Sequence, residues 1–299
     1  MRLISFYVGQ EIKPGALLDQ TIIDLNAAAA TFGLRGVSSV RAALDSPNGR
    51  SRIAAILAAA KGKTGVWALE SCSVRLAPPI PNPSKILGVA LNYYDACQRG
   101  KIEIPKSLKV FAKLPTTVIG PQDAIELPAG PKVTYEGELG VVIGRRGRNI
   151  AVANAWDYVA GYTVVNDLTA NDISKEDVQL LRGKNFDTFC PFGPALVTRD
   201  EVPDPYPLRL KTTVNGAVRQ DSTVGQLIFK IPEIIHYFAS FLTLEPGDLI
   251  ATGTPAGTAL QHDPPAFLAA GDVVTVAVEG IGEIANKVIP ATQGAAVGH

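Results

Sequence analysis

The sequence is poor in the residues that build disulfide frameworks and zinc sites. Its 299 residues include three cysteines, Cys72, Cys97 and Cys190, which lie far apart and never in Cys-x-x-Cys spacing. An odd and scattered set of this kind argues against a disulfide-stabilised fold and against structural zinc. We therefore predict a protein of a reducing compartment, the cytoplasm.

The chain also lacks an excess of either charge, and it lacks long hydrophobic runs. Lys and Arg together number 28, as do Asp and Glu, so no overall field attracts nucleic acid or an acidic membrane. The longest alanine-rich stretches are too short to span a bilayer, and the amino terminus shows no signal-peptide pattern. A Gly-x-Gly-x-x-Gly fingerprint is absent as well, which disfavours a Rossmann nucleotide site. We expect a small-molecule ligand, and neither a nucleic-acid nor a membrane partner.

The apolar pattern changes once along the chain. Residues 1–75 alternate short strand-like segments with alanine-rich helical ones, which predicts a small α+β amino-terminal domain. The proline-rich residues 76–84 predict a linker. Residues 85–290 are dominated by short segments rich in Val, Ile and Thr, with helices expected only near 152–158 and 231–242. Residues 291–299 are too poor in apolar side chains to pack and are expected to be disordered. The predicted fold class is α+β, mainly β.

Three acidic residues mark the most informative part of this larger domain. Glu136 and Glu138 stand at the head of the apolar run 139–143, and because side chains alternate along a strand they point to the same face. Asp167 closes a second apolar segment, 161–166. Three carboxylates without a nearby Cys or His predict a hard cation, Mg²⁺, Mn²⁺ or Ca²⁺.

Several short motifs occur in an order that resembles the fumarylacetoacetate hydrolase family. They are LNY at 91–93, FAK at 111–113, YEGEL at 135–139, GYTVVND at 161–167, GKNFDTFCP at 183–191, VNG at 214–216, PGD at 246–248 and TGTP at 252–255. The resemblance runs from about residue 85 to residue 288. It implies a mixed β-sandwich roll, usually a homodimer, that binds Mg²⁺ or Mn²⁺ through the three carboxylates and acts on 2-oxo acids or 1,3-dicarbonyl compounds.

The same resemblance assigns roles to residues around the metal. Lys184 matches the lysine that faces the substrate, and a fixed cation there stabilises a developing oxyanion. Thr254 matches a position that contacts the substrate carboxylate, and Gly253 beside it lets the backbone approach a ligand. Asn166 is expected to orient the metal-binding aspartate or the substrate, and Tyr93 is a further substrate-binding candidate.

The chain departs from the family at the groups that activate water. Relatives that hydrolyse C–C bonds carry a His-Glu dyad after the Asn-Tyr motif, where this chain has Ala96 and Arg99. We predict that residues 94–104 still form a lid, on which Arg99 binds an anionic substrate group and Cys97 or Glu103 offers an alternative acid or base.

A second departure follows the metal-binding aspartate. Relatives carry an Arg and a Gln that polarise the carbonyl under attack, and this chain has Asn171 and Ser174 at those positions. Both changes remove groups that serve hydrolysis and leave the metal-binding groups in place.

Three functions fit these residues. In the main interpretation the protein is a metal-dependent hydrolase of a C–C bond, with water activated by the metal or by Glu103. In the second the metal stabilises an enolate without activating water, as in decarboxylation, isomerisation or tautomerisation, dehydration or cyclisation. In the third the protein binds metal or ligand and is catalytically silent.

Overall fold

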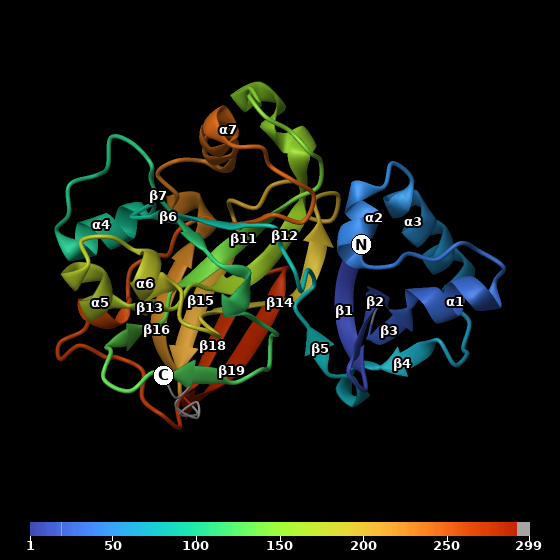
Figure 1. Cartoon of the computed structure of the whole chain (residues 1–299), viewed down its shortest axis with the longest axis horizontal. Coiled ribbons are helices and arrows are strands. Elements are labelled where there is room, and N and C mark those ends of the chain that lie inside the picture. The colour runs from blue at the N-terminus through green and yellow to red at the C-terminus, as the bar shows by residue number, and fades with distance from the viewer. Residues whose placement is uncertain (19, 292–299) are drawn as a thin grey trace, which may run out of the picture.

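The computed structural model describes residues 1–18 and 20–291, and within them most strands join one large sheet (Figure 1). The strand order from edge to edge is β4 (Ala68–Glu70), β3 (Thr21–Asp24), β2 (Glu11–Leu18), β1 (Arg2–Val8), β14 (Cys190–Thr198), β12 (Val159–Asn166), β11 (Gly137–Ile143), β17 (Leu249–Ala251), β6 (Ile86–Ala90) and β7 (Lys109–Lys113). Two further strands complete this 12-stranded sheet: β5 (Leu76–Ala77) pairs with β1, and β8 (Val118–Ile119) pairs with β14. The prediction of a mainly β protein is confirmed.

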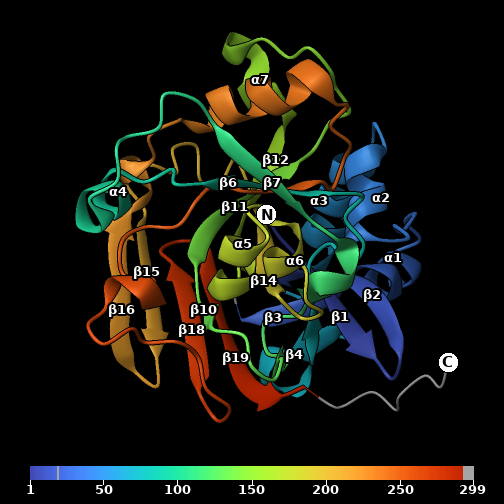
Figure 2. The same cartoon turned by 60° about the vertical axis from the view of Figure 1, so that its left-hand side comes forward.

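A second sheet packs against the carboxyl-terminal half of the first. Its order is β16 (Ala217–Thr223), β15 (Arg209–Val214), β18 (Val273–Val278), β19 (Gly282–Pro290) and β9 (Ile125–Leu127), and a further pair is formed by β10 (Val133–Thr134) and β13 (Thr169–Ala170). Leu139 and Val141 of β11 share one hydrophobic core with Val276 of β18 and Val288 of β19. Figure 2 shows the five-stranded sheet on the side away from the amino-terminal helices, so the two sheets form a sandwich.

Every residue of β11 and β12 is buried, which explains why both read as continuous apolar runs. The two strands pair antiparallel, with Gly137 opposite Asn166 and Val141 opposite Tyr162. This register brings the start of β11 to the end of β12. The residues just outside the pair, Glu136 and Asp167, therefore lie side by side, and the Asp167 N–H donates to the Glu136 carbonyl at 2.8 Å.

The amino-terminal residues continue the main sheet and add three helices to one of its faces. The helices are α1 (Leu25–Thr31), α2 (Val40–Asp45) and α3 (Gly49–Ala60). Asp24 ends β3 and starts α1, because its carboxylate accepts the backbone N–H groups of Asn26 and Ala27 at 2.9 and 3.0 Å. β1 pairs with β14, with Arg2 opposite Val197 and Leu3 opposite Leu196.

The segment predicted as a linker, 76–84, begins with β5, which pairs with Ser5 and Phe6 of β1, so its first residues belong to the sheet. The predicted helix at 231–242 is confirmed as α7 (Ile231–Phe241), which buries Ile234, Ile235 and Phe238 against one end of the sandwich. The segment predicted as a helix at 152–158 is a 3-10 helix, η3 (Val152–Tyr158). The tail predicted to be disordered, 291–299, lies outside the described residues from 292 onward.

Short helices complete the fold. They are α4 (Tyr94–Gly100), α5 (Asn171–Glu176), α6 (Leu181–Lys184), and the 3-10 turns η1 (Ser71–Ser73), η2 (Pro115–Thr117), η4 (Val224–Gln226) and η5 (Ala259–Gln261). No helix among the described residues is long and apolar enough to cross a bilayer. α4, α5 and α6 lie near the ends of β6, β13 and β7 (Figure 1).

Candidate active site

The three acidic residues singled out by the sequence meet in the structure. Glu136 precedes β11, Glu138 lies on it, and Asp167 follows β12; one carboxylate oxygen from each lies within 4.8 Å of the others. Asn166 lies at the end of β12 and holds this corner, because its Oδ1 accepts the Glu136 N–H at 3.1 Å. Oxygen ligands at this spacing suit a divalent cation that prefers carboxylates.

Two buried lysines surround Asp167. Lys184, at the end of α6, donates its Nζ to Glu136 Oε2 at 2.9 Å and also to Asp167 Oδ2. Lys113, at the end of β7, brings its Nζ to 2.8 Å from Asp167 Oδ1 as an ion pair, without the angle of a hydrogen bond. It donates instead to the carbonyl oxygens of Lys184 at 2.6 Å and Leu168 at 3.2 Å. Both lysines are thus fixed as cations next to the carboxylates.

The charges of this cluster do not balance. Three carboxylates and two ammonium groups leave one negative charge in excess, in a place from which water is largely excluded. Burial raises the pKa of Glu136, and burial together with Asp167 raises that of Glu138 well above its usual range. Burial alone would raise the pKa of Asp167 as well, but Lys113 and Lys184 more than offset it and hold that pKa low.

The cluster therefore fits a divalent cation on its own chemistry. Glu138 Oε2 accepts the Gly253 N–H at 2.7 Å, and among the described residues its Oε1 accepts no hydrogen bond. A divalent cation bound by Glu136, Glu138 and Asp167 would more than offset the one excess negative charge of the cluster and would favour ionised Glu138 despite its burial.

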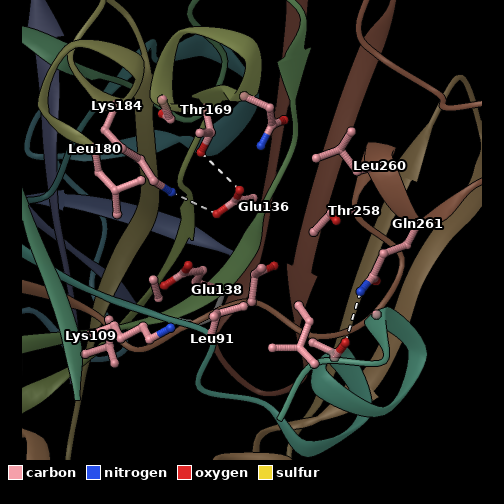
Figure 3. Close-up of a pocket in the computed structure, with 18 residues that line it drawn as sticks. Leu91, Lys109, Glu136, Glu138, Thr169, Leu180, Lys184, Thr258, Leu260 and Gln261 are labelled. Carbon is pink, nitrogen blue, oxygen red and sulfur yellow. Dashed lines mark hydrogen bonds and ion pairs between the residues drawn. The ribbon is translucent and has the colours of Figure 1, made fainter. Parts of the chain in front are cut away.

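The carboxylates open into a cavity of about 550 Å³ (Figure 3). Its wall is apolar on several sides and polar near the cluster. The apolar residues include Val89, Leu91, Ala96, Ile102, Leu180 and Leu260, and the polar and charged ones are Lys109, Glu136, Glu138, Thr169, Asn171, Ser174, Lys184, Thr254, Thr258 and Gln261. A cavity with an apolar wall and a few convergent polar groups is the usual form of a small-molecule site.

The turn after β17 positions the predicted Gly253 and Thr254. Gly253 has φ +113°, and a Cβ there would lie 2.7 Å from Asn92 Cβ, so the position requires glycine. Thr254 Oγ1 donates to the Gly137 carbonyl at 2.9 Å and accepts Gln220 Nε2 at 2.8 Å. A hydroxyl has only one proton to donate, and that of Thr254 is used in the hydrogen bond to the Gly137 carbonyl, although the residue lines the cavity.

Other residues predicted for the site do not line the cavity. Tyr93 is fully buried and its hydroxyl has no hydrogen-bond partner. Arg99 is exposed and donates its Nη2 to the Gln261 carbonyl at 2.9 Å, so its guanidinium contacts the backbone where a substrate contact was expected. Cys97 is buried, and burial raises the pKa of its thiol, which disfavours the thiolate. Glu103 is 84% exposed and lies 3.8 Å from Lys106.

The structure adds residues that the sequence left without a role. Gln261 donates its Nε2 to the Ala96 carbonyl at 3.0 Å and accepts the Gly257 N–H at 2.7 Å, so it ties α4 to the loop beyond Thr254. Gln220 comes from the second sheet and also accepts the Gly137 N–H at 2.9 Å. Single glutamines outside the metal motif carry no sequence signal of these contacts. Asn171 Oδ1 and Ser174 Oγ are buried without a hydrogen-bond partner.

Comparisons with known proteins agree on one family. The model of the fumarylacetoacetate hydrolase C-terminal domain matches residues 85–289. A mitochondrial oxaloacetate tautomerase of Xenopus laevis is 38% identical over 300 residues, which is 97% of this chain and 90% of the relative. An oxaloacetate tautomerase of Bacillus subtilis is 43% identical over 220 residues, covering 72% of this chain and 73% of the relative.

A solved relative has the same fold. The structure of maleylpyruvate hydrolase from a Sphingobium species, in complex with manganese(II) and pyruvate, superposes with a TM-score of 0.80 at 29% identity, over 98% of this chain and 100% of that one. The family match covers more than half of the chain, and the three carboxylates lie where its motif predicts. This protein belongs to the fumarylacetoacetate hydrolase family of enzymes.

Proposed function

We propose that this protein is a divalent-metal-dependent tautomerase that interconverts the enol and keto forms of a 2-oxo acid. The observation that carries this proposal is the lining of the cavity. Glu136 and Glu138 of the three-carboxylate cluster line it, while Ala96 lines it at the position where hydrolysing relatives carry the dyad histidine. Tautomerisation moves a proton between oxygen and carbon and adds no water, so it does not need a group that activates water, which is the role of that histidine. The names of the two relatives from Xenopus laevis and Bacillus subtilis support the same reaction.

Glu136, Glu138 and Asp167 would hold the cation, Mg²⁺ or Mn²⁺. When bound, such a cation withdraws charge from the oxygens of a 2-oxo acid and so stabilises its enolate. The manganese(II) and pyruvate in the solved relative support both the kind of ion and the kind of ligand.

Lys184 supplies a second, fixed positive charge. Burial opposes its protonation, but Asp167 and Glu136 raise its pKa above the ordinary value, so it remains an ammonium at neutral pH. It is therefore unsuited to act as a general base, and it stabilises negative charge that develops in the cavity. Thr169 donates its hydroxyl to Glu136 Oε1 at 3.0 Å and holds the carboxylate that Lys184 also contacts.

The proposal is tested by two reactions on one protein sample. Ketonisation of enol-oxaloacetate, followed by its ultraviolet absorbance, should be accelerated in the presence of Mg²⁺ and not in the presence of a chelator. Glu138→Gln should lose the acceleration, and Glu103→Gln, which changes an exposed carboxylate, should retain it. Cleavage of acylpyruvates without accelerated ketonisation would contradict the proposal and favour the hydrolase. Release of pyruvate from oxaloacetate as the only reaction would favour a decarboxylase.

The family also leads us to propose a homodimer, and the scattered cysteines lead us to propose a cytoplasmic location. Sedimentation velocity of the purified protein measures the oligomeric state, and a monomer at micromolar concentration would contradict the homodimer. The ligand expected from these residues is a small 2-oxo acid or dicarbonyl compound.

A further inference from the structure

The cavity contains one cation that no acidic group neutralises. Lys184 is paired with Glu136 and Asp167, whereas the side chain of Lys109 makes no ion pair or hydrogen bond with any of the described residues. Lys109 lies at the start of β7, and its side chain is exposed and lines the cavity. An unpaired ammonium group at the wall of an otherwise largely apolar cavity is suited to bind an anionic part of a ligand.

The sheet fixes the position of Lys109 relative to the metal ligands. Lys109 pairs with Ala90 of β6. When the pairing of β6 with β17 is continued two residues beyond Ala251, Gly253 lies opposite Ala90. The pairing of β17 with β11, continued in the same way, places Glu138 opposite Gly253 and completes one row across the sheet. The hydrogen bond between the Gly253 N–H and Glu138 Oε2 lies on the same row. Residues that are directly opposite in a sheet point to the same face, so Lys109 and Glu138 both face the cavity (Figure 3).

The row also gives the distance between the backbones of Lys109 and Glu138. Neighbouring strands lie about 4.8 Å apart, so three intervals place the backbones of Lys109 and Glu138 about 14 Å from each other. The two side chains and a ligand between them share this span. The side chains cover part of this span, and a ligand that carries one anionic group at each end can bridge the rest.

The volume of the cavity agrees with a long ligand. A cavity of about 150 Å³ holds benzene, which corresponds to roughly 25 Å³ for each heavy atom. At that ratio oxaloacetate, with nine heavy atoms, fills about 225 Å³, whereas the cavity measures about 550 Å³. Val89, Leu91 and Ile102 line the cavity and offer methylene groups an apolar surface.

We propose that Lys109 binds a second carboxylate at the end of the substrate away from the metal, so that the substrate is a 2-oxo acid with two carboxylates. The inference rests on the proposed function for the reacting end of the molecule, the 2-oxo acid at the metal. Lys109 is then the residue that determines specificity for diacids over monoacids.

The experiment compares two ligands of equal length that differ only at the far end. Titration calorimetry on the Mg²⁺-saturated full chain measures the affinity for 2-oxoadipate, which carries the second carboxylate, and for 2-oxohexanoate, which carries a methyl group. We expect the diacid to bind about tenfold more tightly, the effect of one partly exposed charge pair with favourable geometry. Lys109→Met should reduce this ratio to about one, and Lys109→Arg should preserve most of it.

Controls separate this inference from the proposed function. Lys106→Met changes a lysine that is 91% exposed and does not line the cavity, and it should keep the wild-type ratio. An unchanged ratio in Lys109→Met, or no preference in the wild type, overturns the role of Lys109. A Lys109→Met protein that binds 2-oxohexanoate more weakly than the wild type does also overturns it, because that loss does not depend on the far carboxylate. If the preference is present but deuterium exchange at C3 of either acid is not accelerated, the proposed function fails while the role of Lys109 stands.

Discussion

Replacing Glu138 by Gln should stabilise the metal-free protein and at the same time abolish its stabilisation by Mg²⁺. Without the Glu138 carboxylate, two carboxylates face two ammonium groups and the charges of the cluster balance. The amide keeps an oxygen that can accept the Gly253 N–H. Burial, and after it the charge of Asp167, raises the pKa of Glu138 well above its usual range, so ionised Glu138 is unfavourable in the metal-free fold.

The magnitude follows from the geometry of the cluster. Two charges 4.8 Å apart interact by about 3.5 kcal/mol at an effective dielectric constant of about 20. For Glu138, the repulsion from the other two carboxylates and the attraction to the two lysines largely cancel. What remains is part of the free-energy cost of removing the Glu138 carboxylate from water. We therefore expect Glu138→Gln to raise the free energy of unfolding by about 1–3 kcal/mol in a chelator. Mg²⁺ at a hundred times its Kd should add about 2.7 kcal/mol to the wild type and nothing to the variant.

Urea unfolding followed by tryptophan fluorescence measures both effects, since Trp67 is buried in the described structure. Glu103→Gln, at a carboxylate that is 84% exposed, is the matched control and should behave as the wild type with and without Mg²⁺. If Glu138→Gln were less stable than the wild type in the chelator, the charge of Glu138 would not be the one that destabilises the metal-free protein. An undiminished stabilisation of the variant by Mg²⁺ would remove Glu138 from the metal site.

Three further substitutions test the surroundings of the metal. Lys113→Met should lower the free energy of unfolding by about 3–5 kcal/mol, because it leaves one side of Asp167 without its buried counter-charge, and a loss below about 1 kcal/mol in urea unfolding would refute this. Lys184→Met should reduce kcat about 10²–10³-fold at saturating Mg²⁺, since it removes the charge next to the developing oxyanion, and an unchanged kcat would exclude that role. Gln261→Leu should speed amide exchange of α4, because the side chain hydrogen bond to the Ala96 carbonyl is lost, and equal protection of residues 94–100 would show that Gln261 does not hold the helix.

The cluster of three carboxylates was predictable because its signal is local. Glu136 and Glu138 are two residues apart, and the apolar runs of β11 and β12 show that both strands are buried. The remaining step, the approach of Asp167, needs only the antiparallel pairing of two strands that follow one another among the strands of the main sheet. α7 was predictable for a related reason, since its apolar stripe extends over three turns.

Lys184 was predicted from the family resemblance, whereas the role of Lys113 and those of the two glutamines were beyond the reach of the sequence. Lys113 and Lys184 are far apart along the chain and meet only because β7 and α6 flank Asp167. α4, α5 and α6 have seven residues or fewer, too short for a helical period to be recognised. The position of Arg99 depends on such a helix, so the motif alone predicted a substrate contact where the side chain lies outside the cavity.

The pairing of β1 with β14 has a consequence for how far the family's common domain can be isolated from this chain. A protein cut to begin at residue 76 would lose β1 and expose the edge of β14, and it would uncover Val165, Phe192 and Leu196, which now pack in one cluster with α1, α2 and α3. An unpaired strand edge next to bare apolar side chains is a template for intermolecular β-pairing. The shortened protein should therefore precipitate or pair edge to edge, so the unit that folds is here larger than the segment that the family model matches.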